Sequence, residues 1–457
     1  MSVLWTDKTV VQATGGEAVG TWEASGISID TRTLQAGDLF IPLKDVRDGH
    51  EFIPMAFENG AAAVISERHI EDVPAVIVKS AQQALEDMAR SKSDLAQRVA
   101  ITGSVGKTSV KEMVAHICRA AGKTHASIKS YNNHWGVPYT LAGMPIDTEY
   151  GIFEMGMNHA GELAYLSQIV QPDIAAITKI APAHLANFES IREIAQAKAE
   201  VFRGLTPQGL AIVPDDSGYE DAFKEELAGS YVTIKLLKFG SQKGSHGRIV
   251  SAVNSPNGSQ VELNILGKTV EFELPMVGAH WVENATCALL ISSTLGIVID
   301  VAVNALKTMG KISGRGESHA VTIRRKKIIL IDEAYNANPE SMRAAIAALG
   351  LHDGRKVAVL GDMLELGKTE KKLHAHLKSH LENHNIDLVV TCGPLMKALH
   401  DELPENINGG WFENSEDCAA KLIPMLKSND TVMIKGSNAS GMSKLVTAFK
   451  NNKKTRK

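Results

Sequence analysis

The sequence predicts an α/β protein built on mainly parallel sheets. From about residue 98 onward, short β-branched runs alternate with helical patterns, which is typical of repeated βαβ units. A glycine-rich turn at residues 102–109 joins a predicted strand to a predicted helix. The 457 residues exceed one ordinary core, and about 100 to 200 residues per domain predicts a small number of domains, of which we expect three.

Composition excludes several classes of protein. A net charge of -4 gives no reason to expect a nucleic-acid partner. The four cysteines are far apart and form no CxxC pair, so we expect reduced core thiols rather than a disulfide framework or a zinc site. The N-terminus has no basic and apolar leader, and the apolar stretch 285–303 contains polar residues. We therefore expect a cytoplasmic protein without integral membrane contact.

The first 97 residues differ from the rest and predict a compact α+β recognition domain, 1–97. A central domain, 98–312, would begin with a strand at 98–102 and a helix at 107–121. Its further elements would be buried strands at 152–155 and 174–178, a helix at 190–205 and a polar hairpin insertion at 241–267. A Ser190/Glu193 capping box would open the 190–205 helix.

The last domain, 313–457, repeats the α/β pattern. Its predicted strands are short apolar runs separated by helical segments, at residues 328–331, 357–360, 388–391 and 432–434.

The turn at residues 102–109, TGSVGKTS, has the composition of a phosphate-binding loop. Backbone N–H groups and the dipole of the following helix converge on an anion at such a turn, and a nucleotide phosphate is the natural ligand. Lys107 would reach the outer phosphates, and the Thr108 hydroxyl would coordinate Mg²⁺. Ile101 stands where a full Walker motif has its first glycine. The alternative is a tight glycine turn without a ligand.

Two further polar residues follow predicted strands. Glu154 precedes Gly156, which would present its carboxylate at the C-terminal sheet edge, beside the phosphate loop. Magnesium binding is the functional interpretation, and an ordinary exposed loop glutamate is the alternative. His184 stands just past the next strand, where a lone histidine is more often structural.

Lys198 falls on the apolar stripe of its predicted helix, at i+7 from Ile191 and i+4 from Ile194. One interpretation is snorkelling, with the ammonium reaching water. The other is partial burial, which would lower the amine pKa and give a neutral nucleophile. Such an amine could capture CO₂ as a carbamate and become an anionic metal ligand.

Together these residues resemble the Mur ligase family, over nearly the whole chain and in the expected order. The stretches that carry the resemblance are the phosphate loop, YNNHWGVP at 131–138, FEMGMNH at 153–159, AHLANF at 183–188, AKAE at 197–200, GAH at 278–280, GRG at 314–316 and DEAYNANP at 332–339.

The resemblance implies an ATP-dependent amide-bond ligase with a small α+β N-terminal domain, a central P-loop parallel-sheet ATPase domain and a C-terminal Rossmann-like domain. It implies that Lys198 is carbamylated and that it shares a magnesium site, for two Mg²⁺ ions, with Thr108, Glu154 and His184. Lys107, Glu154, His184 and Lys198 would be catalytic. The implied nucleotide site comprises Gly103, Ser104, Val105, Gly106, Lys107, Thr108, Ser109, Asn284, Arg315, Asp332, Tyr335 and Asn336.

Within the family, YNANP at 335–339, GDMLELG at 361–367 and KGS at 435–437 look like the member that adds D-alanyl-D-alanine to UDP-N-acetylmuramoyl-tripeptide. The expected partners are these two substrates and ATP, and the expected state is a monomer. DTR at 30–32 and GDLF at 37–40 are similar to that member's UDP-sugar domain. The substrate-binding residues implied are Ser28, Thr31, Arg32, Asn132 and Asn133.

The chain departs from the family pattern at Lys179, Trp281 and Asn438, where asparagine, asparagine and arginine are common. Two alternative functions remain open. One keeps the chemistry but changes the acceptor, as in a folylpolyglutamate synthase or another Mur ligase that adds a single amino acid. The other is a P-loop nucleotide switch that makes no bond, for which Glu154, His184 and Lys198 would have no common purpose.

Overall fold

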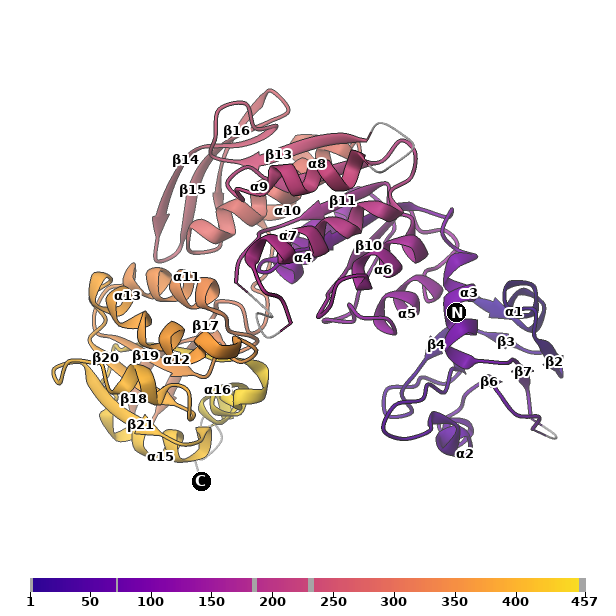
Figure 1. Cartoon of the computed structure of the whole chain (residues 1–457). Helices are drawn as coiled ribbons and strands as arrows, with labels where there is room; N and C mark the ends of the chain where they lie inside the picture. Colours follow the sequence, from indigo (N-terminus) through magenta and orange to yellow (C-terminus); the bar gives the residue numbers. More distant parts are fainter. Residues whose placement is uncertain (1–2, 71–72, 183–186, 229–233, 452–457) are drawn as a thin grey trace.

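The computed structural model describes residues 3–70, 73–182, 187–228 and 234–451. Along the described chain, three large sheets follow one another, with a two-stranded sheet beside the first, and the middle large sheet lies between the other two in space (Figure 1). Most strand pairs are parallel, so the predicted α/β class is confirmed. None of the described helices is both long enough and apolar enough to cross a bilayer.

The N-terminal part is a small sheet in the order β2-β7-β6-β5-β4, beside a two-stranded ribbon of β1 and β3. The strands are β1 (Trp5–Thr6), β2 (Glu17–Val19), β3 (Glu23–Ala24), β4 (Gly26–Ser28), β5 (Asp38–Phe40), β6 (Ala63–Ser66) and β7 (Ala75–Ile77), and the helices are α1 (Asp7–Thr14), α2 (Ile53–Glu58) and α3 (Ala81–Arg90).

The central sheet has the order β16-β15-β14-β13-β12-β11-β8-β10-β9. Its strands are β8 (Gln97–Thr102), β9 (Thr124–Ala126), β10 (Tyr150–Glu154), β11 (Ile174–Ile177), β12 (Leu210–Pro214), β13 (Lys235–Gly240), β14 (Gly247–Ser255), β15 (Gly258–Ile265) and β16 (Lys268–Leu274). Its helices are α4 (Lys107–Ala121), α5 (Gly136–Ala142), α6 (Glu162–Val170), α7 (Ile191–Ala199), α8 (Glu220–Ala228), α9 (Ala279–Thr294) and α10 (Ile299–Lys307). Strands β14 to β16 are antiparallel and include the predicted hairpin.

The last sheet has the order β17-β18-β22-β19-β20-β21, with only the β17–β18 pair antiparallel. Its strands are β17 (Glu317–Ile323), β18 (Lys326–Glu333), β19 (Lys356–Gly361), β20 (Leu388–Cys392), β21 (Asn408–Phe412) and β22 (Thr431–Lys435), and its helices are α11 (Pro339–Gly350), α12 (Glu370–Ala375), α13 (Leu377–Asn383), α14 (Lys397–His400), α15 (Ser415–Met425) and α16 (Met442–Asn451).

The central parallel strands are buried on both faces, which explains why β8, β10 and β11 are nearly continuous apolar runs rather than alternating ones. Helices α4, α9 and α10 cover one face of this sheet, and helices α5 to α8 cover the other. All four cysteines are buried and free, as expected for core thiols. The proposed domain boundary at 312/313 falls between β16 and β17 of successive sheets, whereas the one at 97/98 falls one residue inside β8, which begins at Gln97.

The predicted helix at 190–205 is shorter than expected. Helix α7 ends at Ala199, and residues Glu200–Gly204 continue as a 3₁₀ helix. A 3₁₀ helix is more tightly wound than an α-helix, so the apolar residues no longer follow the same face. Only half of the predicted capping box forms. The Ser190 hydroxyl accepts from the Glu193 N–H at 3.2 Å, but the Glu193 carboxylate accepts from the Glu189 N–H instead.

Two buried side chains join the N-terminal part to the end of α5. The Trp5 indole donates to the Ala142 carbonyl at 2.9 Å, and the Lys92 ammonium donates to the Met144 carbonyl at 2.6 Å. The same ammonium lies 4.5 Å from the centre of the Trp5 ring. Burial lowers the pKa of Lys92 to about 7. The joint is thus made of directional bonds to main-chain carbonyls.

Candidate active site

A cavity of about 800 Å³ lies between the carboxyl edge of the central sheet and residues of the last sheet. The phosphate loop, the end of β10 and the start of α9 form one side. The loops after β18 and β22, with helix α11, form the other. Ligand sites of parallel sheets lie at this edge because the loops there alternate direction and leave a crevice. This cavity is therefore the candidate active site.

The phosphate loop connects β8 to α4 through two glycines with positive φ, Gly103 at +149° and Gly106 at +89°. Side chains would not fit at either position. A Cβ on Gly103 would lie 2.0 Å from the Thr178 hydroxyl, and one on Gly106 would lie 2.6 Å from the Asn284 side-chain oxygen. The predicted residues from Ser104 to Ser109 line the cavity, with the N-terminus of α4 directed at it. An anion-binding turn is the chemical result.

Lys107 lies at this N-terminus, and its ammonium donates to the Gly103 carbonyl at 2.7 Å. Burial lowers its pKa, the Glu154 carboxylate opposes that effect, and the Arg315 guanidinium adds to it. The charge of Lys107 in the phosphate loop thus interacts with Glu154 at the end of β10 and with Arg315, which follows α10. Lys107 is thus positioned to meet a phosphate that replaces its present carbonyl partner.

Glu154 ends β10 and is 1% exposed. Its Oε1 accepts from the Asn132 side-chain amide at 2.8 Å, whereas its buried Oε2 has no hydrogen-bond partner in the described part of the chain. A buried carboxylate oxygen without a partner is costly. A divalent cation would satisfy it, so the donor set fits a magnesium site. The alternative of an ordinary exposed glutamate is excluded.

Lys198 is 1% exposed, so the snorkelling interpretation is wrong. Burial first, and the charge of Lys107 second, lower the pKa of its amine well below the usual value. Among the described residues its side-chain amine has no hydrogen-bond or ion-pair partner, and Lys198 does not line the cavity itself. The Lys107 ammonium nevertheless lies close enough to the Lys198 amine to lower its pKa. A neutral amine is what carbamate formation requires.

The next strand adds Lys179, which the sequence marked as a departure from the family. Its carbonyl accepts from the Ser104 N–H at 2.8 Å, and its ammonium donates to Glu283 at 2.9 Å and lies 3.6 Å from Asp216. Burial alone would lower the pKa of Lys179, but these carboxylates outweigh it and raise the pKa. Asn284 follows Glu283 on α9 and also lines the cavity. The departure is therefore accommodated by an ion pair.

The last part of the chain supplies an aromatic and cationic wall. The Arg315 guanidinium lies 4.5 Å from the centre of the Tyr335 ring, and Asn336 lines the cavity beside them. A stacked pair of this kind offers a flat surface to a planar base. The predicted residues Arg315, Tyr335 and Asn336 thus lie in one place.

Two residues that sequence reasoning missed complete this wall. Glu333 and Lys435 line the cavity from the neighbouring strands β18 and β22, with their charged atoms 3.3 Å apart. The Lys435 ammonium also donates to the Asn336 carbonyl at 3.0 Å. Lys435 was noted only as part of the KGS motif. For the strand beside it, the sequence prediction named Asp332 rather than the next residue, Glu333.

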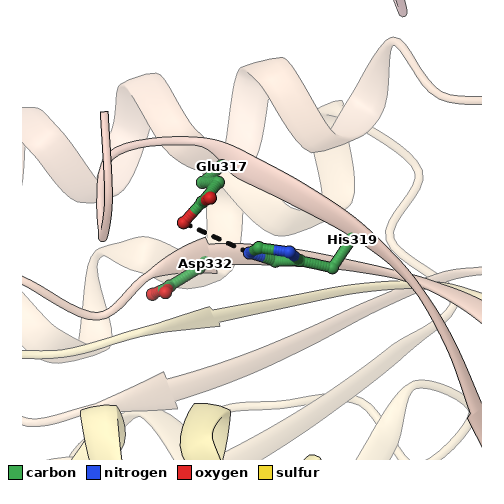
Figure 2. Close-up of side chains that lie close together, drawn as sticks. All are labelled: Glu317, His319 and Asp332. Atoms are coloured by element: carbon green, nitrogen blue, oxygen red, sulfur yellow. Dashed lines mark ion pairs between the residues drawn. The ribbon is translucent and has the colours of Figure 1, made fainter. Parts of the chain in front are cut away.

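The Asp332 prediction does not agree with the structure. Successive residues of a strand point to opposite faces, so Glu333 faces the cavity and Asp332 faces away from it. Figure 2 shows Asp332 beside Glu317 and His319 on the β17–β18 pair. One carboxylate oxygen or ring nitrogen from each of the three lies within 4.8 Å of the others. The Lys450 ammonium lies 2.9 Å from Asp332 and 3.6 Å from Glu317, and supplies a positive charge to this cluster.

The predicted substrate residues fall into two groups. Asn132 and Asn133 line the cavity, where Asn132 binds Glu154 and the Asn133 side-chain oxygen accepts from the Gly136 N–H at 2.9 Å. Ser28, Thr31 and Arg32 lie in the N-terminal part, outside the described lining of the cavity, and Arg32 is bound to Asp30.

His184 lies outside the described residues. Along the sequence it follows β11.

Comparison with known proteins agrees with this geometry. The model of the Mur ligase middle domain matches residues 101–292, and that of the Mur ligase, glutamate ligase domain matches residues 315–438. UDP-N-acetylmuramoyl-tripeptide–D-alanyl-D-alanine ligase of Rickettsia prowazekii (strain Madrid E) is 32% identical, over 98% of this chain and 100% of the relative. The Escherichia coli (strain K12) enzyme of the same name is 31% identical, over 93% and 94%.

A crystal structure of MurF from Acinetobacter baumannii superposes with a TM-score of 0.85 at 29% identity, covering 97% of this chain and 98% of that one. Likeness of this extent runs through the N-terminal part, the phosphate loop and the last sheet alike. The chain therefore belongs to the Mur ligase family and, within it, to the UDP-N-acetylmuramoyl-tripeptide–D-alanyl-D-alanine ligases.

Proposed function

We propose that the protein joins D-alanyl-D-alanine to UDP-N-acetylmuramoyl-tripeptide with ATP, giving the UDP-linked pentapeptide of peptidoglycan synthesis, as a cytoplasmic monomer. One observation carries the ligase chemistry: a phosphate loop and the buried carboxylate of Glu154, whose Oε2 has no partner among the described residues, face an aromatic and cationic wall across one cavity. The names of the relatives supply the substrates.

The reaction needs a better leaving group than oxide. The terminal carboxylate of the tripeptide would attack the γ-phosphorus of ATP, releasing ADP and forming an acyl phosphate. The amine of the dipeptide would then attack the acyl carbon and expel inorganic phosphate, losing its proton to the surroundings. Both steps depend on positioning and charge neutralisation, which Lys107 and the backbone N–H groups of the loop provide.

The proposed magnesium ligands are Thr108, Glu154, His184 and carbamylated Lys198. Mg²⁺ would neutralise the phosphate oxygens and orient them. The unpaired Oε2 of Glu154 is the support from geometry, and the buried amine of Lys198 is the support for the carbamate. In that modification the neutral amine adds to CO₂ and releases one proton, which turns an uncharged buried amine into an anionic ligand.

The proposed domains would divide the substrates between them. Residues 1–97 would hold the UDP-sugar, with Ser28, Thr31 and Arg32 among its contacts. Residues 98–312 and 313–457 would hold ATP between them, through the loop and Asn284 on one side and Arg315, Tyr335 and Asn336 on the other. Enclosing the acyl phosphate between the domains would protect it from water.

The deciding experiment is phosphate release from ATP with UDP-N-acetylmuramoyl-tripeptide, with and without D-alanyl-D-alanine, followed by the product mass. Release that requires both substrates and yields a UDP-pentapeptide supports the proposal. Release that ignores the dipeptide but requires another amino acid would point to a different acceptor. Hydrolysis that needs neither substrate would favour a nucleotide switch.

The carbamate has a test of its own. Lys198→Ala should nearly abolish turnover, and short carboxylates should restore part of it by occupying the vacated site. Full activity of Lys198→Ala without additives would refute the carbamate. Lys123→Ala is a suitable control because Lys123 is an exposed lysine paired with Asp147 on the surface.

A further inference from the structure

Lys111 is a fully buried lysine that the proposed reaction does not use. It lies on α4, one turn beyond Lys107, and is 0% exposed. Its ammonium donates to the Ser127 carbonyl at 2.8 Å and to the Lys129 carbonyl at 3.4 Å, and it pairs with the Glu112 carboxylate. A buried ammonium is tolerated only when acceptors surround it. Lys111 therefore ties α4 to the segment that begins at Ser127.

That segment, residues 127–132, holds Glu154 from two sides. The Ser127 hydroxyl accepts from the Glu154 N–H at 3.1 Å, and the Ser127 N–H donates to the Ile152 carbonyl at 2.9 Å. At its other end, the Asn132 amide donates to Glu154 Oε1 at 2.8 Å. The Asn132 carbonyl accepts from the Gly156 N–H at 2.8 Å. Both the backbone and the carboxylate of Glu154 are thus set by this segment.

Between these two ends the segment makes a sharp turn. Lys129 has a φ of +50°, which a side-chain-bearing residue adopts only when its surroundings impose it. The Lys111 ammonium binds the carbonyls on both sides of residue 128, within this turn. Loss of the ammonium would leave two inward-facing carbonyls without their donor and release the turn.

We propose that Lys111 is a positioning residue, which fixes the unpaired oxygen of Glu154 relative to the phosphate loop. The path runs from α4 through Lys111 to the 127–132 segment and from there to Glu154. Because α4 also carries Lys107 at its first position, one helix sets both the phosphate-binding group and the metal-binding carboxylate. The proposal rests on the proposed function only in taking Glu154 as a magnesium ligand beside bound ATP.

The test measures ATP binding rather than turnover. ATP affinity is determined calorimetrically with Mg²⁺ and with EDTA, and the ratio of the two dissociation constants reports the contribution of the metal. In Lys111→Met the ratio should fall by about tenfold or more, the size expected when the support behind a metal ligand is lost. Affinity in EDTA should remain that of the wild type, because Lys107 and the loop are retained.

Lys92→Met is the matched control. Lys92 is another buried lysine bound to a main-chain carbonyl, and neither it nor its partner Met144 is among the residues described as lining the cavity. Its loss therefore reports the general effect of removing a buried lysine side chain. The Mg²⁺ ratio of Lys92→Met should equal that of the wild type, whatever its melting temperature. A Lys111→Met protein that is less stable but keeps the wild-type ratio would show a merely structural lysine and overturn the proposal.

Two further variants decide the matter if Lys111→Met does not fold. Lys111→Arg keeps the charge and its donors and should preserve most of the ratio. Ser127→Ala removes the acceptor of the Glu154 N–H and should lower the ratio without altering affinity in EDTA. A wild-type ratio in Ser127→Ala would overturn the proposal. Neither readout requires the peptide substrates, so a failure of the proposed acceptor leaves this test intact.

Discussion

Replacing Gly103 by alanine tests how far the phosphate loop depends on the lack of a side chain. The added Cβ would lie 2.0 Å from the Thr178 hydroxyl and 3.1 Å from the Lys179 nitrogen. That hydroxyl lies 3.2 Å from the Thr102 carbonyl and 2.5 Å from the Val105 carbonyl, and so fastens the loop to β11. The substitution therefore strains the backbone and displaces the side chain that holds the loop.

The cost can be worked from these contacts. A residue held at φ of +149° without being glycine costs about 1–3 kcal/mol. Loss of the Thr178 hydrogen bond adds about 0.5–1.5 kcal/mol. The sum of about 1.5–4.5 kcal/mol is less than the stability of many domains, about 5–15 kcal/mol, so Gly103→Ala should fold but bind ATP poorly. Gly267→Ala is the control: its φ is +87°, no described atom lies within 4 Å of the added Cβ, and the cost should be only about 1–2 kcal/mol.

Denaturant unfolding gives the first quantity, and ATP affinity in the presence of Mg²⁺ gives the second. Gly103→Ala should lose more stability than Gly267→Ala and should lose most of its ATP affinity, while Gly267→Ala binds ATP normally. If Gly103→Ala loses no more stability than the control and binds ATP as the wild type does, the loop has room for a side chain and the reasoning is refuted.

Three further predictions concern neighbouring features. Lys92 has a pKa of about 7 in the folded chain against 10.5 ordinarily, so the folded state binds fewer protons than the unfolded state between these values. The free energy of unfolding of the wild type should therefore rise relative to that of Lys92→Met from pH 7 to 10, by at most about 1.4 kcal/mol per pH unit. Urea titrations in which the difference between the two proteins does not change with pH would contradict this. Asn132→Ala should weaken Mg²⁺ binding because it removes the donor to Glu154. Asn133→Ala, which removes the acceptor at the start of α5, should instead cost about 1 kcal/mol of stability. Equal Mg²⁺ affinities for the two variants would contradict a role for the Asn132 contact with Glu154. Glu333→Gln should reduce ATP affinity or turnover and Asp332→Asn only stability, and the reverse pattern would show that Asp332 serves the cavity.

Regular elements with a clear local cause were predictable. The helix at 107–121 begins where the glycine turn ends and carries an apolar stripe, and the structure gives the same bounds. The same stripe argument placed Lys198 on the buried face of α7, although the sequence alone could not decide between burial and snorkelling. That choice depends on how much chain covers the ammonium, which is a property of the tertiary packing.

Other features lay beyond the sequence for identifiable reasons. Asp332 and Glu333 are adjacent acids on one strand, and a shift of one residue exchanges the two faces, so composition could not tell which acid meets the cavity. The roles of Lys111 and of Lys179 depend on carbonyls and carboxylates that are distant along the chain. The end of α7 at Ala199 has no glycine or proline to signal it.

The Trp5 and Lys92 bonds to the end of α5 have a consequence for the length of the substrate. Helix α5 begins just after Asn133, which lines the cavity, and the N-terminal part is bound at the other end of this helix. One short helix thus joins the N-terminal part to the border of the cavity. A UDP-sugar bound to the N-terminal part would hold the end of its peptide at a fixed distance from that part. A peptide one residue too short would bind at its sugar end and still leave its carboxylate away from the phosphate loop.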